Sequence, residues 1–335
     1  MAISNDLLSS TLYSIRDTEV DELYKKVAFL DGVRRAGGVE TESGGIKIQR
    51  PLSIAEHSTI TQLATGYEPV SLAVNDVLRP AIYDWADFTA PIVITKKEEM
   101  ENSGEYAIVK ILEARMKSVM GMLRRELNKQ ILTNGSTVLT AVNTLNGDSA
   151  GTGSATGFLE HVATTAQTNT VGGISKATFQ VPGWLNQFRD AGGTLAMSDL
   201  YDLYIAANSV APSGDISHVI MSSGCLAAYR NLLFAQERFV QTDKLDGGRM
   251  GLAFNGAVAE QDPEMGFASS VGPHPVSAYM LNYDGIKLCF HSEGDFAVSP
   301  FEHVSGTTAR AAQLYVKVQL LADFLGGQGV LIDAG

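Results

Sequence analysis

The pattern of hydrophobic and polar positions is most regular over residues 105–132, where the periodicity predicts one long amphipathic helix. Its apolar residues recur every three or four positions and share one stripe of a helix: Ile108, Ile111, Leu112, Met116, Val119, Met120, Leu123, Leu127 and Ile131. The opposite face is charged and carries Lys110, Glu113, Lys117, Arg124, Arg125 and Lys129. Asn134-Gly135 supplies a stop, and the helix would be about 40 Å long.

The segments before this helix predict a shorter helix and a long β-ribbon. Val20 to Arg35 has helical spacing and is closed by Gly37-Gly38. Residues 44–79 contain two runs of β-forming residues, GIKIQRPLSI and EPVSLAVNDVL, which predict a two-stranded ribbon. A hairpin with so little core of its own is marginal in water, so we expect it to rest on another surface, such as a second subunit. Residues 81–95 predict a further extended segment.

The remainder predicts an α/β region followed by a β tail. Residues 137–157 end in the Gly/Ser/Thr-rich NGDSAGTGSATG, which is typical of a boundary or a loop. Within 158–285, the pattern predicts helices at 158–167, 194–208 and 225–234, and strands at 218–222, 252–259 and 278–282. In the tail it predicts strands at 287–290, 296–299 and 312–321 and in the segment VLID; the period-2 alternation of 312–321 indicates a sheet with one wet face.

Composition narrows the classes of protein. The 335 residues carry 25 Lys and Arg against 37 Asp and Glu, a net charge of −12, which disfavours wrapping nucleic acid through a basic surface. No apolar run approaches the length of a membrane span, and the N-terminus lacks the pattern of a secretory signal, which favours a protein made inside the cell. The two cysteines, Cys225 and Cys289, have no paired spacing and are interpreted as buried thiols of a reducing compartment.

Candidate catalytic and cofactor patterns are weak. Gly151-Thr-Gly-Ser-Ala-Thr-Gly157 departs from the dinucleotide spacing, and Asp246-Gly-Gly-Arg249 lacks the Lys-Ser/Thr pair of a P-loop, so both are interpreted as loops. The six histidines are scattered, and His291, Glu293 and Asp295 are the only suggestion of a metal cluster, on a loop of ordinary polar composition. We therefore predict no enzyme activity, no cofactor and no metal.

Other prominent residues have structural interpretations. Glu98, Glu99 and Glu101 precede the long helix, where acidic groups complement the helix dipole. Trp85 and Trp184 are interpreted as core anchors.

The order of these segments resembles the major capsid proteins of tailed double-stranded DNA bacteriophages, which have the Hong-Kong-97-type fold. The resemblance lies in the helix ending at Gly-Gly, GIKIQRPLSI, Gly66-Tyr67-Glu68, YDWADFTAPIVIT, and EEMENSG before the long helix. Further along it includes Val171-Gly-Gly-Ile174, Gly183-Trp184-Leu-Asn186, Glu237-Arg238-Phe239, Gly251-Leu-Ala-Phe-Asn-Gly256 and the alternating C-terminal strand.

The resemblance implies an α+β fold with four parts. Residues 1–43 would be an N-terminal arm and helix, and residues 44–79 an extended loop lying across a neighbouring subunit. Residues 80–157 and 286–335 would form the peripheral domain, with 105–132 as its spine helix. Residues 158–285 would be the axial domain, which meets its symmetry mates.

The resemblance also implies a function without catalysis: self-assembly into the pentamers and hexamers of an icosahedral head in the virion, assembled in the host bacterial cytoplasm. Assembly or fold-defining roles fall on Gly45, Pro51, Gly66, Glu68, Trp85, Glu98, Gly104, Trp184 and Arg238. The expected partners are other copies of the chain, a portal, separate scaffold and decoration proteins, and enclosed double-stranded DNA that is not bound by sequence. Lys-to-Asn cross-links occur in some relatives, and no such pair is identifiable here.

Two alternatives stay open at this point. One is a shell of the related encapsulin type, which would hold a protein cargo. The other is a soluble α/β enzyme, which would show a deep pocket with converging titratable groups.

Overall fold

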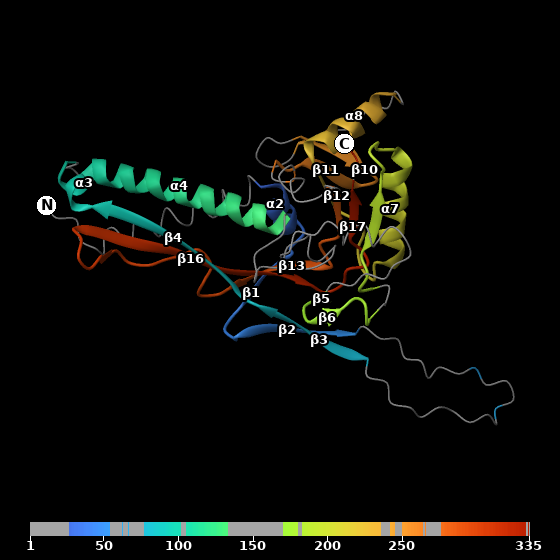
Figure 1. The fold of residues 1–335 in the computed structure, drawn as a ribbon, viewed down its shortest axis with the longest axis horizontal. Coiled ribbons are helices and arrows are strands. Elements are labelled where there is room, and N and C mark those ends of the chain that lie inside the picture. Colours follow the sequence, from blue (N-terminus) through green and yellow to red (C-terminus); the bar gives the residue numbers. More distant parts are fainter. Residues whose placement is uncertain are drawn as a thin grey trace.

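The computed structural model describes residues 27–53, 77–101, 105–132, 170–179, 183–235, 242–244, 250–263 and 276–332, with the single residues 62, 66, 265 and 334. Two main sheets, a long helix and a projecting two-stranded ribbon make up the fold (Figure 1). The predicted helix at 158–167, the loop at 137–157 and the first part of the predicted helix at 20–35 lie outside the described residues.

The first sheet has six strands and is organised around β16 (Ala309–Ala322). On one side, β16 pairs antiparallel with β4 (Ala86–Thr95), from Ala309 opposite Thr95 to Val318 opposite Ala86. On the other side it pairs in turn with β13 (Ile286–His291), β14 (Ala297–Val298) and β15 (Glu302–His303). β1 (Val39–Glu42) pairs parallel with β13.

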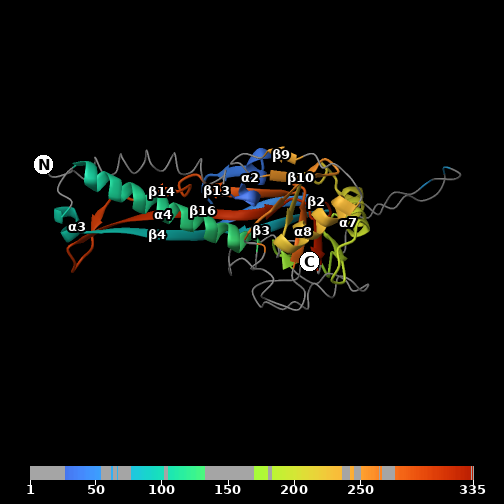
Figure 2. The ribbon, with the colours of Figure 1, turned by 90° about the horizontal axis from the view of Figure 1, so that it is seen from above.

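The long helix α4 spans Glu105–Leu132, as the periodicity predicts, and follows the short helix α3 (Lys96–Glu101). It runs alongside β4 and β16 in both ribbon views (Figures 1 and 2). Its buried side chains in the described half include Met116, Met120, Leu123, Leu127 and Ile131, all on the predicted stripe.

The helix α2 (Ala28–Arg35) ends as predicted at Gly37-Gly38. The N–H of Gly38 donates to the carbonyl of Val33 (2.8 Å), and Gly37 has a left-handed φ of +69°, which is the usual way to close a helix. The chain then turns directly into β1.

The second sheet has seven strands in the order β7-β17-β12-β8-β11-β10-β9. The strands are β7 (Gln187–Asp190), β8 (His218–Met221), β9 (Thr242–Lys244), β10 (Met250–Phe254), β11 (Ala257–Gln261), β12 (Val276–Leu281) and β17 (Gly329–Ile332). Helices α7 (Met197–Val210) and α8 (Ser223–Ala235) pack beside it. The predicted helices at 194–208 and 225–234 and the strands at 218–222, 252–259 and 278–282 are confirmed within a few residues.

One C-terminal strand lies elsewhere than the resemblance implies. β17 belongs to the seven-stranded sheet, between β7 and β12, rather than to the sheet beside α4. All four of its residues are buried. A strand buried on both faces suits a central position in a covered sheet, and Gly329 lets Leu203 of α7 pack directly against its backbone.

The ribbon consists of β2 (Lys47–Ser53) and β3 (Leu78–Asp84), paired antiparallel from Lys47 opposite Asp84 to Ser53 opposite Leu78. Its second strand begins at Leu78, the last residue of EPVSLAVNDVL, whose residues before 77 are not described. The predicted extended segment at 81–95 is divided at Trp85, because β3 belongs to the ribbon and β4 to the six-stranded sheet. A small hairpin of β5 (Thr170–Val171) and β6 (Ile174–Ser175) lies against the ribbon.

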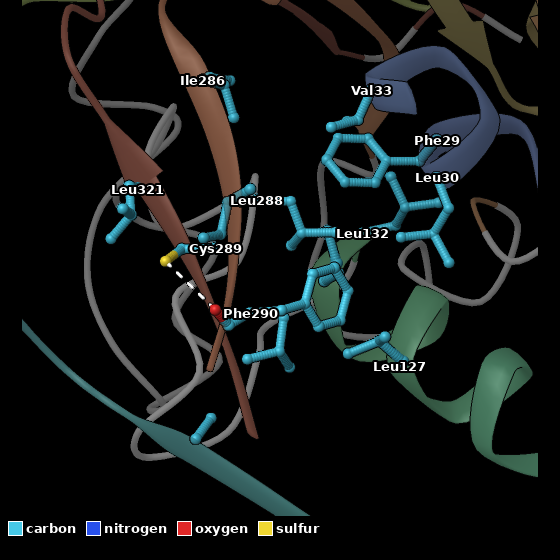
Figure 3. Close-up of a cluster of buried hydrophobic side chains, with 14 of the residues drawn as sticks. Phe29, Leu30, Val33, Leu127, Leu132, Ile286, Leu288, Cys289, Phe290 and Leu321 are labelled. Atoms are coloured by element: carbon cyan, nitrogen blue, oxygen red, sulfur yellow. Dashed lines mark hydrogen bonds between the residues drawn. The ribbon is translucent and has the colours of Figure 1, made fainter. Parts of the chain in front are cut away.

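A single hydrophobic cluster fills the junction of α2, α4 and the first sheet (Figure 3). Phe29, Leu30 and Val33 of α2 face Leu127 and Leu132 of α4, and Leu288 and Phe290 of β13 close the cluster from the sheet. A second cluster lies between the seven-stranded sheet and helices α7 and α8. No described helix is long and apolar enough to cross a membrane.

The predicted wet face of β16 is only half correct. Gln313 is exposed and Tyr315 and Lys317 are partly exposed, but Gln319 is fully buried. The Gln319 amide donates to the carbonyl of Asp84 (2.5 Å), so the base of the ribbon covers this part of the face.

Candidate assembly surface

The ribbon has one face toward the subunit and one face outward. Ile48, Leu52, Ala81 and Tyr83 are buried in the main hydrophobic cluster. Their neighbours along each strand point the other way and are exposed. The described part of the ribbon therefore has a core contact within its own subunit, which the sequence pattern does not predict.

The outward face combines one ion pair with apolar side chains. Lys47 and Asp84 pair at the base (2.9 Å), and Ile82 and Leu78 follow, 45% and 65% exposed. Between them Pro51 lies directly opposite Pro80. Neither proline has an N–H, so this must be a non-hydrogen-bonded pair, with both ring nitrogens at the outer edges of the ribbon. Those edges cannot be extended as regular ladders, which directs contacts to the face.

Trp85 fixes the point where the ribbon leaves the sheet. Its Nε1–H donates to the carbonyl of Gly45 (3.2 Å), which ties the start of β2 to the end of β3. The ring meets His291 edge-on, with centroids 5.4 Å apart, and the Lys317 ammonium lies 5.7 Å from its centroid. Gly45 has a φ of +91°, which side-chain-bearing residues rarely adopt.

Tyr83 anchors the inner face of β3 to the end of β16. Its hydroxyl lies 3.3 Å from both the N–H and the carbonyl oxygen of Ala322, accepting from the first and donating to the second. Burial raises the pKa of Tyr83 above its usual value, so the hydroxyl stays protonated and can do both. Beside it, Arg50 of β2 forms an ion pair with Glu40 of β1.

Glu98 joins β4, α3 and α4. Its carboxylate accepts from the Thr95 N–H (3.0 Å), and its own N–H donates to the Thr95 hydroxyl (3.4 Å), which forms a capping box at the start of α3. The Arg115 guanidinium donates to both carboxylate oxygens of Glu98 (2.5 and 3.2 Å) and also to the carbonyl of Val93 (2.6 Å). Hydrogen bonds from Arg115 and then Thr95 lower the pKa of Glu98 to about 2.

The other predicted residues divide into two groups. Trp184 is buried in the main cluster, as expected of a core anchor, and Gly66 has a left-handed φ of +83°. Glu68, Gly104 and Arg238 lie outside the described residues. The structure brings Gly45 and Trp85 together, but it keeps Glu98 and Trp184 in separate places.

A buried polar network joins α2 to the seven-stranded sheet. His218 approaches Glu260 through Nε2 (2.8 Å) and the Tyr283 hydroxyl through Nδ1 (2.5 Å). A carboxylate only accepts, so the Nε2–H of His218 donates to Glu260. Arg35 of α2 pairs with Asp31 (2.8 Å) and lies 3.8 Å from Glu260. Burial, then the Glu260 charge, raises the pKa of Tyr283 well above its usual value.

The C-terminal end of α4 is held by the same sheet. Asn128 donates to both carboxylate oxygens of buried Asp262 (3.1 and 3.2 Å), and the Tyr279 hydroxyl donates to the carbonyl of Leu132 (3.3 Å). Arg115 thus attaches the long helix to β4 through Val93, and Asn128 and Leu132 attach its C-terminal end to the second sheet.

Candidate chemistry is sparse in the described part of the chain. No group of three His, Cys, Asp or Glu side chains there has the geometry of a metal site. His291 instead lies near two backbone N–H groups, that of Gly44 at Nε2 (3.3 Å) and that of Glu293 at Nδ1 (3.2 Å), and an imidazole can accept from only one of them at a time. Both cysteines are free and buried, as predicted.

The sequence matches no protein-family profile, and it matches no curated protein. Solved structures are similar to it over nearly its whole length. The capsid asymmetric unit of cyanophage A-1(L) matches with a TM-score of 0.61 and 15% identity, covering 89% of this chain and 90% of that chain. The capsid of the empty GTA particle matches with a TM-score of 0.58 and 12% identity, over 91% and 90% of the two chains.

The chain has the Hong-Kong-97-type capsid fold. The SrpI encapsulin complex from Synechococcus elongatus PCC 7942 also matches, with a TM-score of 0.53 and 11% identity, over 90% of this chain and 87% of that chain. At these identities the likeness concerns the fold, and it confirms the mixed α and β architecture expected from the order of the sequence motifs.

Sequence reasoning missed three residues of this surface: Tyr83, Arg115 and Gly172. Tyr83 lies in the predicted extended segment 81–95 and Arg115 in the predicted helix, but neither is singled out by the sequence pattern. Gly172 accepts the backbone N–H of Ile82 at its carbonyl (2.8 Å), and no pattern in the sequence links it to the ribbon 90 residues earlier. Each depends on a contact between distant segments, which local periodicity does not encode.

Proposed function

We propose that this protein is a structural shell protein that assembles into the pentamers and hexamers of a phage head around double-stranded DNA. The observation that carries the proposal is the fold, since the structures it resembles over about 90% of their length are capsids. The ribbon supplies a suitable contact surface.

The apolar outward face of the ribbon would be covered by a second copy of the chain. Leu78 and Ile82 lie on this face, and Ile46, just before β2, is 91% exposed. Burying each of these side chains would stabilise a contact by about 1–2 kcal/mol. Such contacts are weak singly, but a closed symmetric shell repeats them at every subunit.

The predicted residues take positioning roles in this proposal. Gly45 and Trp85 set the base of the ribbon, Pro51 blunts its edge, and Glu98 fixes the start of the helical spine. Gly66, Glu68, Gly104, Trp184 and Arg238 remain fold-defining or assembly residues by resemblance. The parts keep the proposed boundaries, 1–43, 44–79, 80–157 with 286–335, and 158–285, except that β3 extends the loop to Asp84 and β17 joins the axial sheet.

The partners would be other copies, a portal, and separate scaffold and decoration proteins. With a net charge of −12 the chain would line the container without gripping the packaged DNA, because like charge opposes phosphate contacts. We place the protein in the virion, after assembly in the bacterial host.

A second candidate is an encapsulin-type compartment, which the similarity to the SrpI encapsulin favours. The content of purified particles separates the two: a protein cargo favours a compartment, and packaged DNA favours a phage head.

The ribbon offers the sharpest test of shell formation. The pairing places Leu52 and Arg79 at a hydrogen-bonded position, so an Asn-Gly turn replacing residues 53–78 would close a short regular hairpin there. The buried base, including Ile48 and Tyr83, stays intact. We expect the wild-type protein to form closed particles and the shortened protein to fold but stay small, by circular dichroism, sizing and electron microscopy.

A point variant gives a finer comparison. Leu78→Ser removes apolar area from the outward face, whereas Gln49→Ser changes a polar residue on the same face. Only the first should weaken assembly. Wild-type protein that forms nothing beyond small oligomers under every assembly condition would refute the proposed function, and normal shells from the shortened protein would refute the role of the ribbon.

A further inference from the structure

The small hairpin at residues 170–175 contacts the ribbon at one defined point. Ile82 of β3 donates its backbone N–H to the carbonyl of Gly172 (2.8 Å). Ile82 lies two residues from Pro80 and, like it, occupies a non-hydrogen-bonded position of the ribbon. Its N–H therefore points away from β2, as this bond requires. Pro80 has no N–H, so the next outward donor toward the tip is Leu78.

Gly172 fits this place because it has no side chain. A Cβ there would lie 2.9 Å from the Ala81 Cβ and 2.9 Å from Tyr83 Cζ. Neither neighbour has freedom to move away. The Cβ of Ala81 is fixed by the backbone of β3, which is paired with β2. The Tyr83 hydroxyl is hydrogen-bonded to both the N–H and the carbonyl of Ala322 in β16. Gly172 therefore lies where the hairpin, the ribbon and the end of β16 meet.

The neighbouring contact strengthens the same joint. The Arg79 guanidinium lies 4.6 Å from the centroid of the Phe179 ring, just after the hairpin. Together the two contacts hold β3 on either side of Pro80, and Figure 1 shows the hairpin of β5 and β6 beside the ribbon.

We propose that the hairpin at Val171–Ile174, through Gly172, is a clamp that sets the direction in which the ribbon leaves the subunit, and so the curvature of the shell. This inference rests on the proposed function for its effect on shells, but the clamp itself is a property of the single subunit. A ribbon released at this joint would reach its neighbour at a variable angle, and subunits would close into particles of more than one size.

The chain supplies a matched pair of glycines for the test. Gly172 has a φ of +56° and Gly173 a φ of +77°, so alanine at either position meets a similar backbone strain. A Cβ at Gly173 would meet nothing within 4 Å, in contrast to Gly172. The comparison of Gly172→Ala with Gly173→Ala thus isolates the contact with the ribbon.

Two readouts are measured for wild type and both variants. Residue-resolved hydrogen exchange should show the Ile82 amide exchanging at least about tenfold faster in Gly172→Ala than in wild type, with Gly173→Ala unchanged. Electron microscopy of assembled material should show uniform shells for wild type and Gly173→Ala, and shells of several diameters or open sheets for Gly172→Ala. Equal Ile82 protection and equal shells in both variants would overturn the clamp.

The outcomes separate the two proposals. If wild type forms no shells, the proposed function fails, and the exchange of Ile82 still decides whether the clamp exists. If Gly172→Ala does not fold, Phe179→Leu weakens the same joint without backbone strain and should raise Ile82 exchange in the same direction. An unchanged Ile82 rate in that variant would count against the clamp.

Discussion

Glu98 shows how one exposed carboxylate can organise several elements. It caps α3 through Thr95, and it holds the Arg115 guanidinium that also satisfies the carbonyl of Val93 on β4. That carbonyl points away from β16, on the side of β4 where no described strand pairs. The bidentate geometry makes the pair directional, although its solvent exposure limits its strength.

The pKa of Glu98 gives a pH-dependent prediction. Because the folded value is about 2, below the ordinary 4.5, the ionised carboxylate stabilises the fold above about pH 4.5, and that stabilisation is lost as the pH falls toward 2. Wild type should therefore exceed Glu98→Gln in urea-unfolding midpoint at pH 7, and the difference should vanish toward pH 2. Glu126→Gln, on the exposed side of α4, is the carboxylate control. A difference between wild type and Glu98→Gln that does not change with pH would contradict the stabilising role of the ionised Glu98 carboxylate.

At the scale of elements, two helical glycines, Gly32 and Gly121, have opposite surroundings. Gly32 in α2 lies against the polar network, where a Cβ would be 2.6 Å from the Nδ1 of His218 and 2.8 Å from the Cζ of Tyr283. Gly121 in α4 has nothing within 4 Å of the same position. The close approach of α2 to the second sheet therefore depends on Gly32, whereas Gly121 only lowers the helix propensity of α4.

This contrast predicts opposite effects of one substitution. Gly121→Ala should stabilise the protein by about 0.5–1 kcal/mol through helix propensity. Gly32→Ala should destabilise it by about 1–3 kcal/mol, because overpacking displaces Tyr283 or His218. Urea unfolding followed by circular dichroism measures both. A shift in the same direction for the two variants would show that packing at Gly32 is not decisive.

At the scale of the whole molecule, the two sheets share one core. The main hydrophobic cluster contains residues of the seven-stranded sheet, among them Ile220, Tyr279 and Val330, together with α2, α4 and the six-stranded sheet. β17 carries the chain from one sheet to the other, and the Asn128–Asp262 contact ties the long helix to the second sheet. Such shared burial favours cooperative unfolding of the body of the subunit.

The two thiols report on this cooperativity. Cys289 lies in the main cluster and Cys225 in the second, and burial raises their pKa values to about 11 and about 12. We expect neither to react with a thiol reagent at pH 8 in the folded protein, and both to be labelled at one common rate in mild denaturant. Cys225→Ala and Cys289→Ala variants assign the two rates. Much faster labelling of Cys225 would show that the second sheet opens independently.

The local elements of this protein follow from the pattern of its amino acids. The stripe of Met116, Met120, Leu123 and Leu127 predicts α4 to the residue, because helical period is written in neighbouring positions. The short strands of the α/β region, the buried tryptophans and the closing glycines of α2 follow from equally local chemistry. The order of these elements also indicated the fold.

Which segments meet cannot be derived from that local pattern and is seen in the fold. The buried Gln319 lies on a face that alternation marks as wet, because the base of the ribbon covers it. β17 joins the second sheet, β3 carries the ribbon on to Asp84, and Gly172 meets Ala81 across a long stretch of chain. These outcomes depend on strand pairing and burial between distant residues, whose free energies local periodicity does not contain.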